Sequence, residues 1–195
     1  MIITTFEWHY YLMIPLQSKF NSNTLIERFD ELKLFTGVTI LDTVFNSCTS
    51  LQHVNFENII RITSSVCRYS ALKHVYLPRV TTFYGYYMFC NCPQLETVIL
   101  DNLYIQNTSQ QTFRDCPKHK WTVWRTDREY VTTHSAHWNG STGGKIYVND
   151  DMYDYFKSLK TSSGTAITSI SNKVHKLSEF ATDYPDIVLP EKVEI

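Results

Sequence analysis

The sequence lacks the features that would indicate binding to nucleic acid, to a membrane or to phosphate groups. Lysine and arginine number 18 against 19 aspartate and glutamate residues, so no basic excess favours nucleic acid or an anionic membrane. No apolar run approaches the roughly 18 residues needed to cross a bilayer. Glycine is scarce, at six residues in 195, and no glycine-rich phosphate loop is present. We therefore expect no nucleic-acid binding and no membrane insertion.

The sequence also lacks signatures of catalysis and of metal binding. It has neither a Gly-x-Ser-x-Gly elbow nor a His-Glu-x-x-His helix. His134 and His137 lie three residues apart, but a metal site would need a further carboxylate or thiolate, and the spacing offers none. We predict that the chain is not an enzyme, has no catalytic residues and binds no metal ion or cofactor.

No signal peptide is visible at the start of the sequence. Residues 1–15 contain Glu7, Trp8 and His9 in place of a basic start followed by an apolar run. The location of the protein therefore stays open. We expect the exterior or the cell surface if the chain is a mature or truncated form, and otherwise a virion or the cytoplasm.

A repeated phrase occupies the middle of the chain. It occurs as Phe45-x-x-Cys48-x-x-Leu51-x-x-Val54-x-Phe56, as Val66-x-x-Tyr69-x-x-Leu72-x-x-Val75-x-Leu77 and as Phe89-x-x-Cys92-x-x-Leu95-x-x-Val98-x-Leu100. The leucine position advances by 21 residues from Leu51 to Leu72 and by 23 from Leu72 to Leu95. Self-similarity at such a period predicts a solenoid whose units stack into one continuous core.

The pattern extends beyond these three phrases in both directions. An earlier opening is Phe20-x-x-Asn23-x-x-Ile26-x-x-Phe29, and Phe113-x-x-Cys116 opens a fifth unit in which His119 stands at the leucine position. Further apolar positions follow the phrases at matched offsets: Ile59, Ile62, Val80, Phe83, Leu103 and Ile105. We predict a right-handed solenoid of about five rungs with these side chains turned inward.

The end of each phrase predicts a short strand. In Leu-x-x-Val-x-Leu the last two apolar residues are two apart, so they share one side of the pleat. The residues between them point outward, and parallel stacking of the rungs would align them in a ladder. The predicted binding residues on this ladder are His53, Asn55, His74, Tyr76, Thr97 and Ile99. His53 and His74 fall in one column, where they could share a metal or sense each other's protonation, although a solvated polar ladder is the simpler interpretation.

The phrases from Tyr69 to Phe83 and from Phe89 to Leu100 resemble the BspA-type leucine-rich repeat. The segment Phe29–Val38 is similar to the first repeat of these proteins, and Lys145–Lys157 with Val174–Phe180 is similar to their closing strand and helix. The resemblance implies a β-rich α+β solenoid with short parallel strands, an N-terminal cap and a C-terminal strand–helix cap. It also implies binding of host proteins or adhesion at bacterial surfaces, or a phage-encoded protein, and no shared catalytic residues.

We predict one domain followed by a tail. The domain covers 1–180, with an N-terminal cap at 1–19, repeats at 20–120, an irregular insertion at 121–144 and a C-terminal cap at 145–180. The tail, 181–195, contains Pro185 and Pro190 and is expected to be extended, either as an assembly strand or as a disordered end.

Aromatic residues are the remaining binding candidates. Trp121, Trp124 and Trp138 lie in or beside the predicted insertion, and irregular insertions often carry function. Aromatic rings suit protein interfaces and sugar stacking, but they also pack in the cores and caps of β-rich folds. Both interpretations stay open.

Five cysteines fall into two repeat columns, Cys48 with Cys92 and Cys116, and Cys67 with Cys90. They could be buried thiols, a disulfide between adjacent rungs, or a metal site at Cys90-Asn91-Cys92. The odd count argues against a full disulfide framework, and a lone Cys-x-Cys lacks the second pair of a zinc site. Buried free thiols are therefore the interpretation we favour.

The sequence as a whole favours a non-catalytic binding module. Its ligand would be a protein or a glycan, held by the ladder or by the aromatic insertion. The alternative is a structural component of a phage particle or of a larger surface complex, in which the C-terminal tail joins copies into a homo-oligomer or larger assembly.

Overall fold

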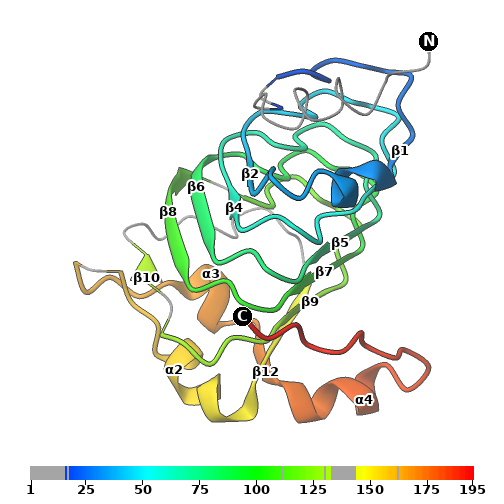
Figure 1. The fold of residues 1–195 in the computed structure, drawn as a ribbon. Helices are drawn as coiled ribbons and strands as arrows, with labels where there is room; N and C mark the ends of the chain where they lie inside the picture. Colours follow the sequence, from blue (N-terminus) through cyan, green and yellow to red (C-terminus); the bar gives the residue numbers. More distant parts are fainter. Residues whose placement is uncertain (1–15, 17, 111, 130, 133–143, 162) are drawn as a thin grey trace.

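The computed structural model describes residues 16, 18–110, 112–129, 131–132, 144–161 and 163–195. The chain winds into a stack of coils, which begins at the top of Figure 1 and ends at a group of short helices at the bottom. Predicted elements that fall on 1–15 and 133–143, including most of the N-terminal cap, lie outside the described residues.

One sheet carries the repeated Val-x-Leu strands. It consists of β5 (His74–Leu77), β7 (Thr97–Leu100), β9 (Trp121–Trp124), β11 (Lys145–Val148) and β12 (Val174–Lys176), all parallel and in this order. In the register, Val75 lies beside Val98 and Leu77 beside Leu100, which confirms the alignment predicted from the repeat. A parallel pair, β1 (Arg28–Phe29) with β3 (His53–Val54), precedes this sheet.

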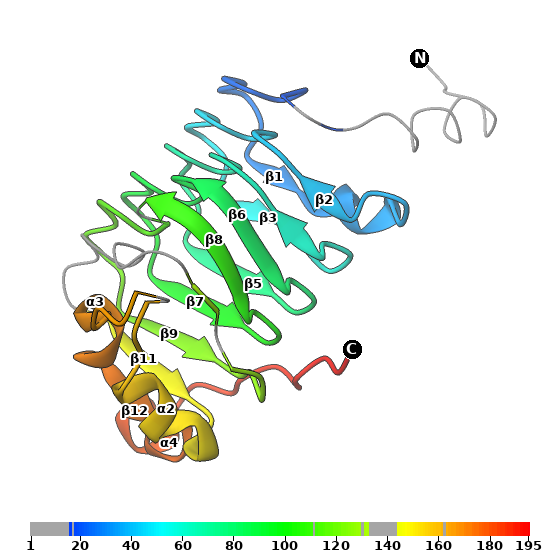
Figure 2. The same ribbon diagram turned by 90° about the vertical axis from the view of Figure 1, so that its left-hand side faces the viewer.

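A second parallel sheet forms another side of the coil. Its strands are β2 (Ile40–Leu41), β4 (Arg61–Ile62), β6 (Thr82–Tyr86), β8 (Ile105–Gln110) and β10 (Val131–Thr132). Figure 2 shows β6 and β8 side by side in front of the first sheet. The repeat predicted inward side chains here, such as Ile62 and Phe83, and both are buried. It did not predict strands. Three of them, β2, β4 and β10, have two residues each and are too short to show the alternation typical of a sheet, and β8 has no apolar residue after Ile105.

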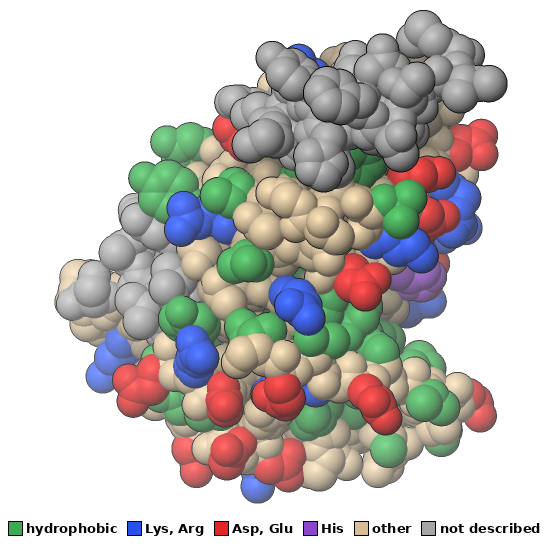
Figure 3. Space-filling view, in the orientation of Figure 1, with side chains coloured by type: hydrophobic (Ala, Val, Ile, Leu, Met, Phe, Trp, Pro, Cys, Tyr) green, Lys and Arg blue, Asp and Glu red, His purple; other side chains and the backbone are tan. Residues whose placement is uncertain are grey.

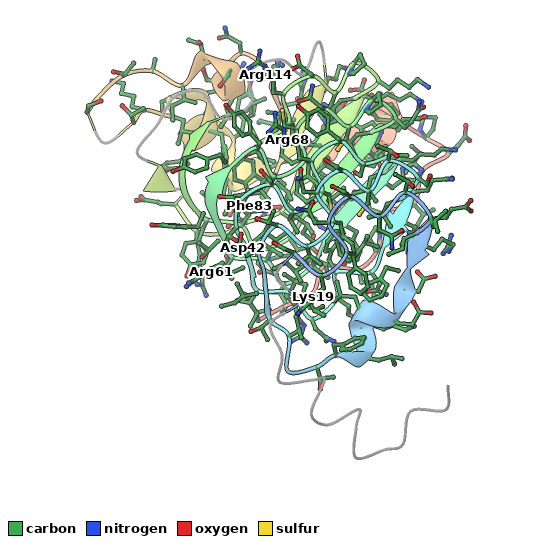
Figure 4. All side chains as sticks on the ribbon, turned by 90° about the horizontal axis from the view of Figure 1, so that it is seen from above. Lys19, Asp42, Arg61, Arg68, Phe83 and Arg114 are labelled. Carbon is green, nitrogen blue, oxygen red and sulfur yellow. The ribbon has the colours of Figure 1, made fainter. Side chains whose placement is uncertain are left out.

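The Phe-x-x-Cys segments form the turns that close each coil. Several of their residues adopt left-handed backbone angles without being glycine, among them Thr43, Ser47, Ser65 and Tyr69. Hydrogen bonds between coils hold these turns, because Thr43 N donates to Ser64 O at 3.0 Å and Ser65 N donates to Tyr86 O at 2.8 Å. Figure 4, a view along the stack, shows Arg68 and Arg114 of these turns apart from Asp42 and Arg61 of the second sheet.

The predicted inward positions form one continuous core. Phenylalanine rings stack from coil to coil, with Phe89 and Phe113 centred 5.5 Å apart and nearly parallel. The cysteines are all buried and free, and Cys48 Sγ and Cys116 Sγ each donate to a carbonyl of the preceding coil. The structure thus agrees with buried free thiols rather than with a disulfide.

The predicted irregular insertion does not begin at Trp121. Residues 121–124 form β9, which pairs in register with β7 and β11, so the ladder continues through this segment. His119 caused the error, since it occupies the leucine position. In the structure its ring is buried and stacks near Phe113, with ring centres 6.4 Å apart, so it fills a core position as leucine does elsewhere.

Short helices lie near both ends of the stack. They are the 3-10 helices η1 (Asp30–Leu34), η2 (Asp150–Met152) and η3 (Leu177–Glu179), and the α-helices α2 (Tyr153–Lys157), α3 (Thr168–Ser171) and α4 (Phe180–Asp183). Helix η1 lies near the start of the stack and the others near its end (Figure 1). Among the described residues, no helix combines the length and the apolar character needed to cross a membrane.

The chain turns back after α4. Residues 184–195, called the strap from here on, contain no helix or strand and run from α4 along the lower part of the first sheet (red in Figures 1 and 2). The predicted tail, 181–195, begins inside α4; its remaining residues, 184–195, have no helix or strand, as expected, and are docked on their own chain.

Candidate binding face

The ladder face consists of the outward side chains of the first sheet and of β1 and β3. In the first sheet the strand register places them in two columns, one with His74, Thr97, Trp121 and Lys145 and the other with Tyr76, Ile99, Val123 and Tyr147. Arg28 lies beside His53 in the separate pair of β1 and β3. Thus the structure brings most of the predicted binding residues onto one face.

The N-terminal half of the ladder face is polar and open. His53 Nε2 lies 2.7 Å from Asp30 Oδ1, and Arg28 pairs with the same carboxylate at 3.0 Å. The hydrogen bond from Arg28 lowers the pKa of Asp30. Figure 3 shows basic, acidic and histidine side chains gathered beside β1 and η1.

The two predicted ladder histidines have different partners. His53 pairs with Asp30, whereas His74 Nδ1 lies 2.8 Å from Thr97 Oγ1 on the next strand. Asn55, in the same part of the face, accepts a hydrogen bond from the backbone N–H of Glu57. Each of the two histidines therefore contacts a different polar side chain. Within the described residues, no group of three or more histidine, cysteine, aspartate or glutamate side chains could hold a metal ion.

The C-terminal half of the ladder face is apolar and covered. Ile99 is 8% exposed and Trp121 is 4% exposed. The ring of Phe180 in α4 meets Trp121 edge-on at 5.0 Å and Tyr147 at 5.1 Å. Two strap residues, Tyr184 and Leu189, pack against the same cluster.

A polar contact fixes α4 over this half. Tyr147 donates a hydrogen bond to Asp183, and Lys145 Nζ forms an ion pair with Asp183 Oδ2 at 2.7 Å. Burial and the neighbouring carboxylate raise the pKa of Tyr147, so its hydroxyl keeps the proton that it donates.

The predicted tryptophan sites need correction. Trp124 points inward, where its Nε1 donates to Leu103 O at 2.8 Å and its ring packs on Phe156. Trp124 has no exposed surface, so it cannot contact a ligand on the face. Trp121 lies on the face but under α4, and Trp138 lies outside the described residues.

Side chains at the ends of the ladder strands hold the strap. Arg125 Nη1 donates to Pro190 O at 2.7 Å, and Asn102 Nδ2 donates to Val193 O at 2.7 Å. Tyr76 donates to Asp101 Oδ2 at 3.0 Å and, at 3.3 Å, to the strap carbonyl of residue 191. Burial and the charge of Asp101 raise the pKa of Tyr76 to about 12, so the phenol remains a donor at neutral pH.

The sequence did not single out Asp101 and Arg125. Both directly follow the last inward residue of a ladder strand, Leu100 or Trp124, where Pro78 stands in an earlier coil. A charged side chain next to a core position was the available signal. The role of Arg125 depends on the strap residue Pro190, which lies 65 residues later in the sequence.

A pocket of about 230 Å³ lies where the open half meets the strap. Its walls combine polar and apolar side chains, and one of them comes from the strap itself. The lining residues are His53, Val54, Asn55, Phe56, Glu57, Tyr76, Pro78 and Val193.

The parallel stacked coils and the ladder face define a solenoid repeat protein. The family model for the BspA type leucine rich repeat region matches residues 20–130 in six copies. The match covers more than half of the chain, and the chain belongs to this family. The family is typically one of non-catalytic modules that bind proteins. Neither the comparison with curated proteins nor the comparison with solved structures gives a match.

Proposed function

We propose that the chain is a non-catalytic protein-binding module whose contact surface is the open half of the ladder face. The observation that carries the proposal is the pocket beside a row of polar ladder residues. Asn55 and Tyr76 line it, and His74 lies exposed on the same face. The membership of a repeat family that often binds proteins supports the same role.

The size of the pocket favours a protein over a small molecule. Small-molecule sites usually enclose roughly 300–1,000 Å³, and this pocket is smaller, at about 230 Å³. A cavity of this size suits one side chain projecting from a protein surface, with the polar ladder contacting the surface around it. A glycan on this face is the competing class of ligand.

The test is a binding screen of purified proteins and glycans with paired variants. Asn55→Arg with His74→Glu alters the open half. Tyr84→Arg with Tyr86→Glu makes equivalent changes at exposed positions of β6, away from the ladder. A protein ligand that the wild type and the β6 variant bind, and that the ladder variant loses, supports the proposal. Loss through the β6 variant instead, or binding of glycans alone, would contradict it.

The assembly alternative has weaker support. In the predicted assembly, the tail joins copies, whereas here residues 190–193 are bound by their own chain. A defined oligomer in light scattering, lost when the strap is removed, would favour the assembly role.

A further inference from the structure

The strap is bound through its backbone. Arg125 and Asn102 donate to the carbonyls of Pro190 and Val193, each at 2.7 Å, and Val193 N donates to Asp101 Oδ2 at 3.4 Å. Side chains that hydrogen-bond the backbone of an extended segment are characteristic of peptide recognition, since such bonds give affinity while pockets give specificity.

The ladder residues that hold the strap are buried. The side chain of Asp101 is fully buried and that of Arg125 is 9% exposed, and Arg125 Nε donates to Asp101 Oδ1 at 2.7 Å. Asn102 is also buried, and its amide donates to Pro78 O at 2.6 Å in addition to the strap. These groups are thus positioned by contacts within the ladder as well as by the strap.

The strap contributes little buried surface to this contact. Val188 is 93% exposed, Ile187 is exposed, and no strand or helix forms after Asp183. Its apolar attachment comes from Tyr184 and Leu189 over the covered half and from Val193 at the pocket wall. A segment with so little buried surface opens at lower free-energy cost than the core strands.

We propose that the strap occupies, in cis, a binding site for an extended polypeptide segment of another protein. The segment would carry a proline followed three residues later by an apolar residue, as in Pro190-Glu191-Lys192-Val193. At the first position, Arg125 binds a carbonyl and no contact requires the N–H that proline lacks. At the second position, Val193 forms part of the lining of the pocket. This inference rests on the proposed protein-binding function and names its partner class and its regulation.

The pocket and the residues that hold the strap are adjacent. Val193 lines the pocket with Asn55 and Tyr76, and its backbone bonds to Asp101 and Asn102, which with Arg125 are called the strap site from here on. A partner segment held at the strap site would therefore continue into the open half of the ladder face. The strap lowers the affinity for such a partner, because apparent affinity falls with the fraction of molecules in which the site is free.

The experiment uses full-length variants and a fluorescent peptide with the sequence of residues 189–195. Val193→Asp places a charge at the pocket wall and should release the strap while leaving Asp101, Asn102 and Arg125 in place. Val188→Asp is the matched control, since this strap residue is 93% exposed. In fluorescence anisotropy, we expect the Val193→Asp chain to bind the peptide at least about tenfold more tightly than the wild type and the control, as for a site that is more than 90% closed. Adding Asn102→Ala should weaken this binding.

Three results would overturn the proposal. The first is that the wild type and the Val193→Asp chain bind the peptide with equal affinity. The second is that the Val193→Asp chain does not bind the peptide at concentrations up to about 1 mM, and the third is a wild-type dimer in which each strap binds the other copy. Circular dichroism checks that each variant is folded, and Val193→Ser replaces Val193→Asp if it is not.

This result is separable from the wider function. Peptide binding to the Val193→Asp chain, with no protein ligand sensitive to Asn55→Arg and His74→Glu, would uphold the strap site and remove the open-half surface. The reverse pattern would uphold the proposed function and remove the strap site.

Discussion

Arg125 and Asp101 form a buried ion pair beneath the strap, with Arg125 Nη2 2.6 Å from Asp101 Oδ1. Burial raises the pKa of Asp101, although Arg125 acts in the opposite direction. The same guanidinium binds Pro190 O, so one side chain serves the ladder and the strap. A buried pair of this kind is costly to break, because removal of one partner leaves a charge without compensation.

Arg125→Met is expected to destabilise the protein by about 3–5 kcal/mol, since Asp101 then loses its partner. Asp101→Leu in the same chain should recover most of this loss, because both charges are then absent. Urea denaturation measures both. If the double variant is no more stable than Arg125→Met, the ion pair is not the cause.

Acid should destabilise the fold through His119. Burial, followed by the charge of Lys173, lowers the pKa of His119 to about 4. Because the unfolded chain takes up a proton near the ordinary pKa of 6.5 and the folded chain does not, stability falls as the pH drops from 6.5 to 4. The shift corresponds to a loss on the order of 3 kcal/mol.

His119→Gln should remove this pH dependence, since glutamine does not titrate and can still contact Thr122, which His119 Nε2 meets at 3.0 Å. His74→Gln, at an exposed ladder position, is the control and should leave it unchanged. Denaturation at several pH values between 4 and 7 decides. An unchanged slope in His119→Gln would assign the acid sensitivity to another group.

Gly85 should tolerate no side chain. Its φ is +107°, and a Cβ would lie 2.1 Å from Ser64 Oγ. Gly164 has φ +84° but open space around it, so it reports the backbone strain alone. We expect Gly164→Ala to cost roughly 1–3 kcal/mol for the backbone and Gly85→Ala to cost more. Equal losses in thermal unfolding would show that Ser64 moves aside without cost.

Leu72→Ala tests the repeat register. Leu72 has no exposed surface, and truncating a fully buried leucine costs roughly 2–5 kcal/mol. Leu25→Ala, at a position 88% exposed, should change the free energy of unfolding by less than about 0.5 kcal/mol. A loss below that limit at Leu72 would show that the register is wrong.

The sequence predicted the ladder well because stacking of the coils restricts which residues can occupy its inward positions. Val75, Val98 and the leucines beside them recur at a fixed period, and the period fixes their register. The second sheet was missed because β2, β4 and β10 have only two residues each and β8 has no apolar residue after Ile105, so none of these strands shows an alternating pattern. The ladder also extends through Trp121, since the buried His119 ring takes the leucine position of that coil and its Nε2 lies 3.0 Å from Thr122 Oγ1.

The covered half of the face could not be predicted from the repeat. Strand alternation predicted that Ile99 points outward, but α4 and the strap cover it. This contact joins residues far apart in sequence, and no local pattern near Ile99 encodes it. Likewise, the outward column at His53 gave no sign of Asp30, which comes from the previous coil.

Thiol labelling tests the division of the ladder face most directly. The native cysteines are buried and should not react with a thiol reagent in the folded chain, so the reaction of an introduced cysteine measures the exposure of that cysteine. His74→Cys lies on the open half and Ile99→Cys on the covered half of the same face. We predict that His74→Cys reacts with a thiol reagent as fast as the unfolded chain does, whereas Ile99→Cys reacts far more slowly. Equal fast reaction at both positions would contradict the strap and α4 as a cover over the ladder face.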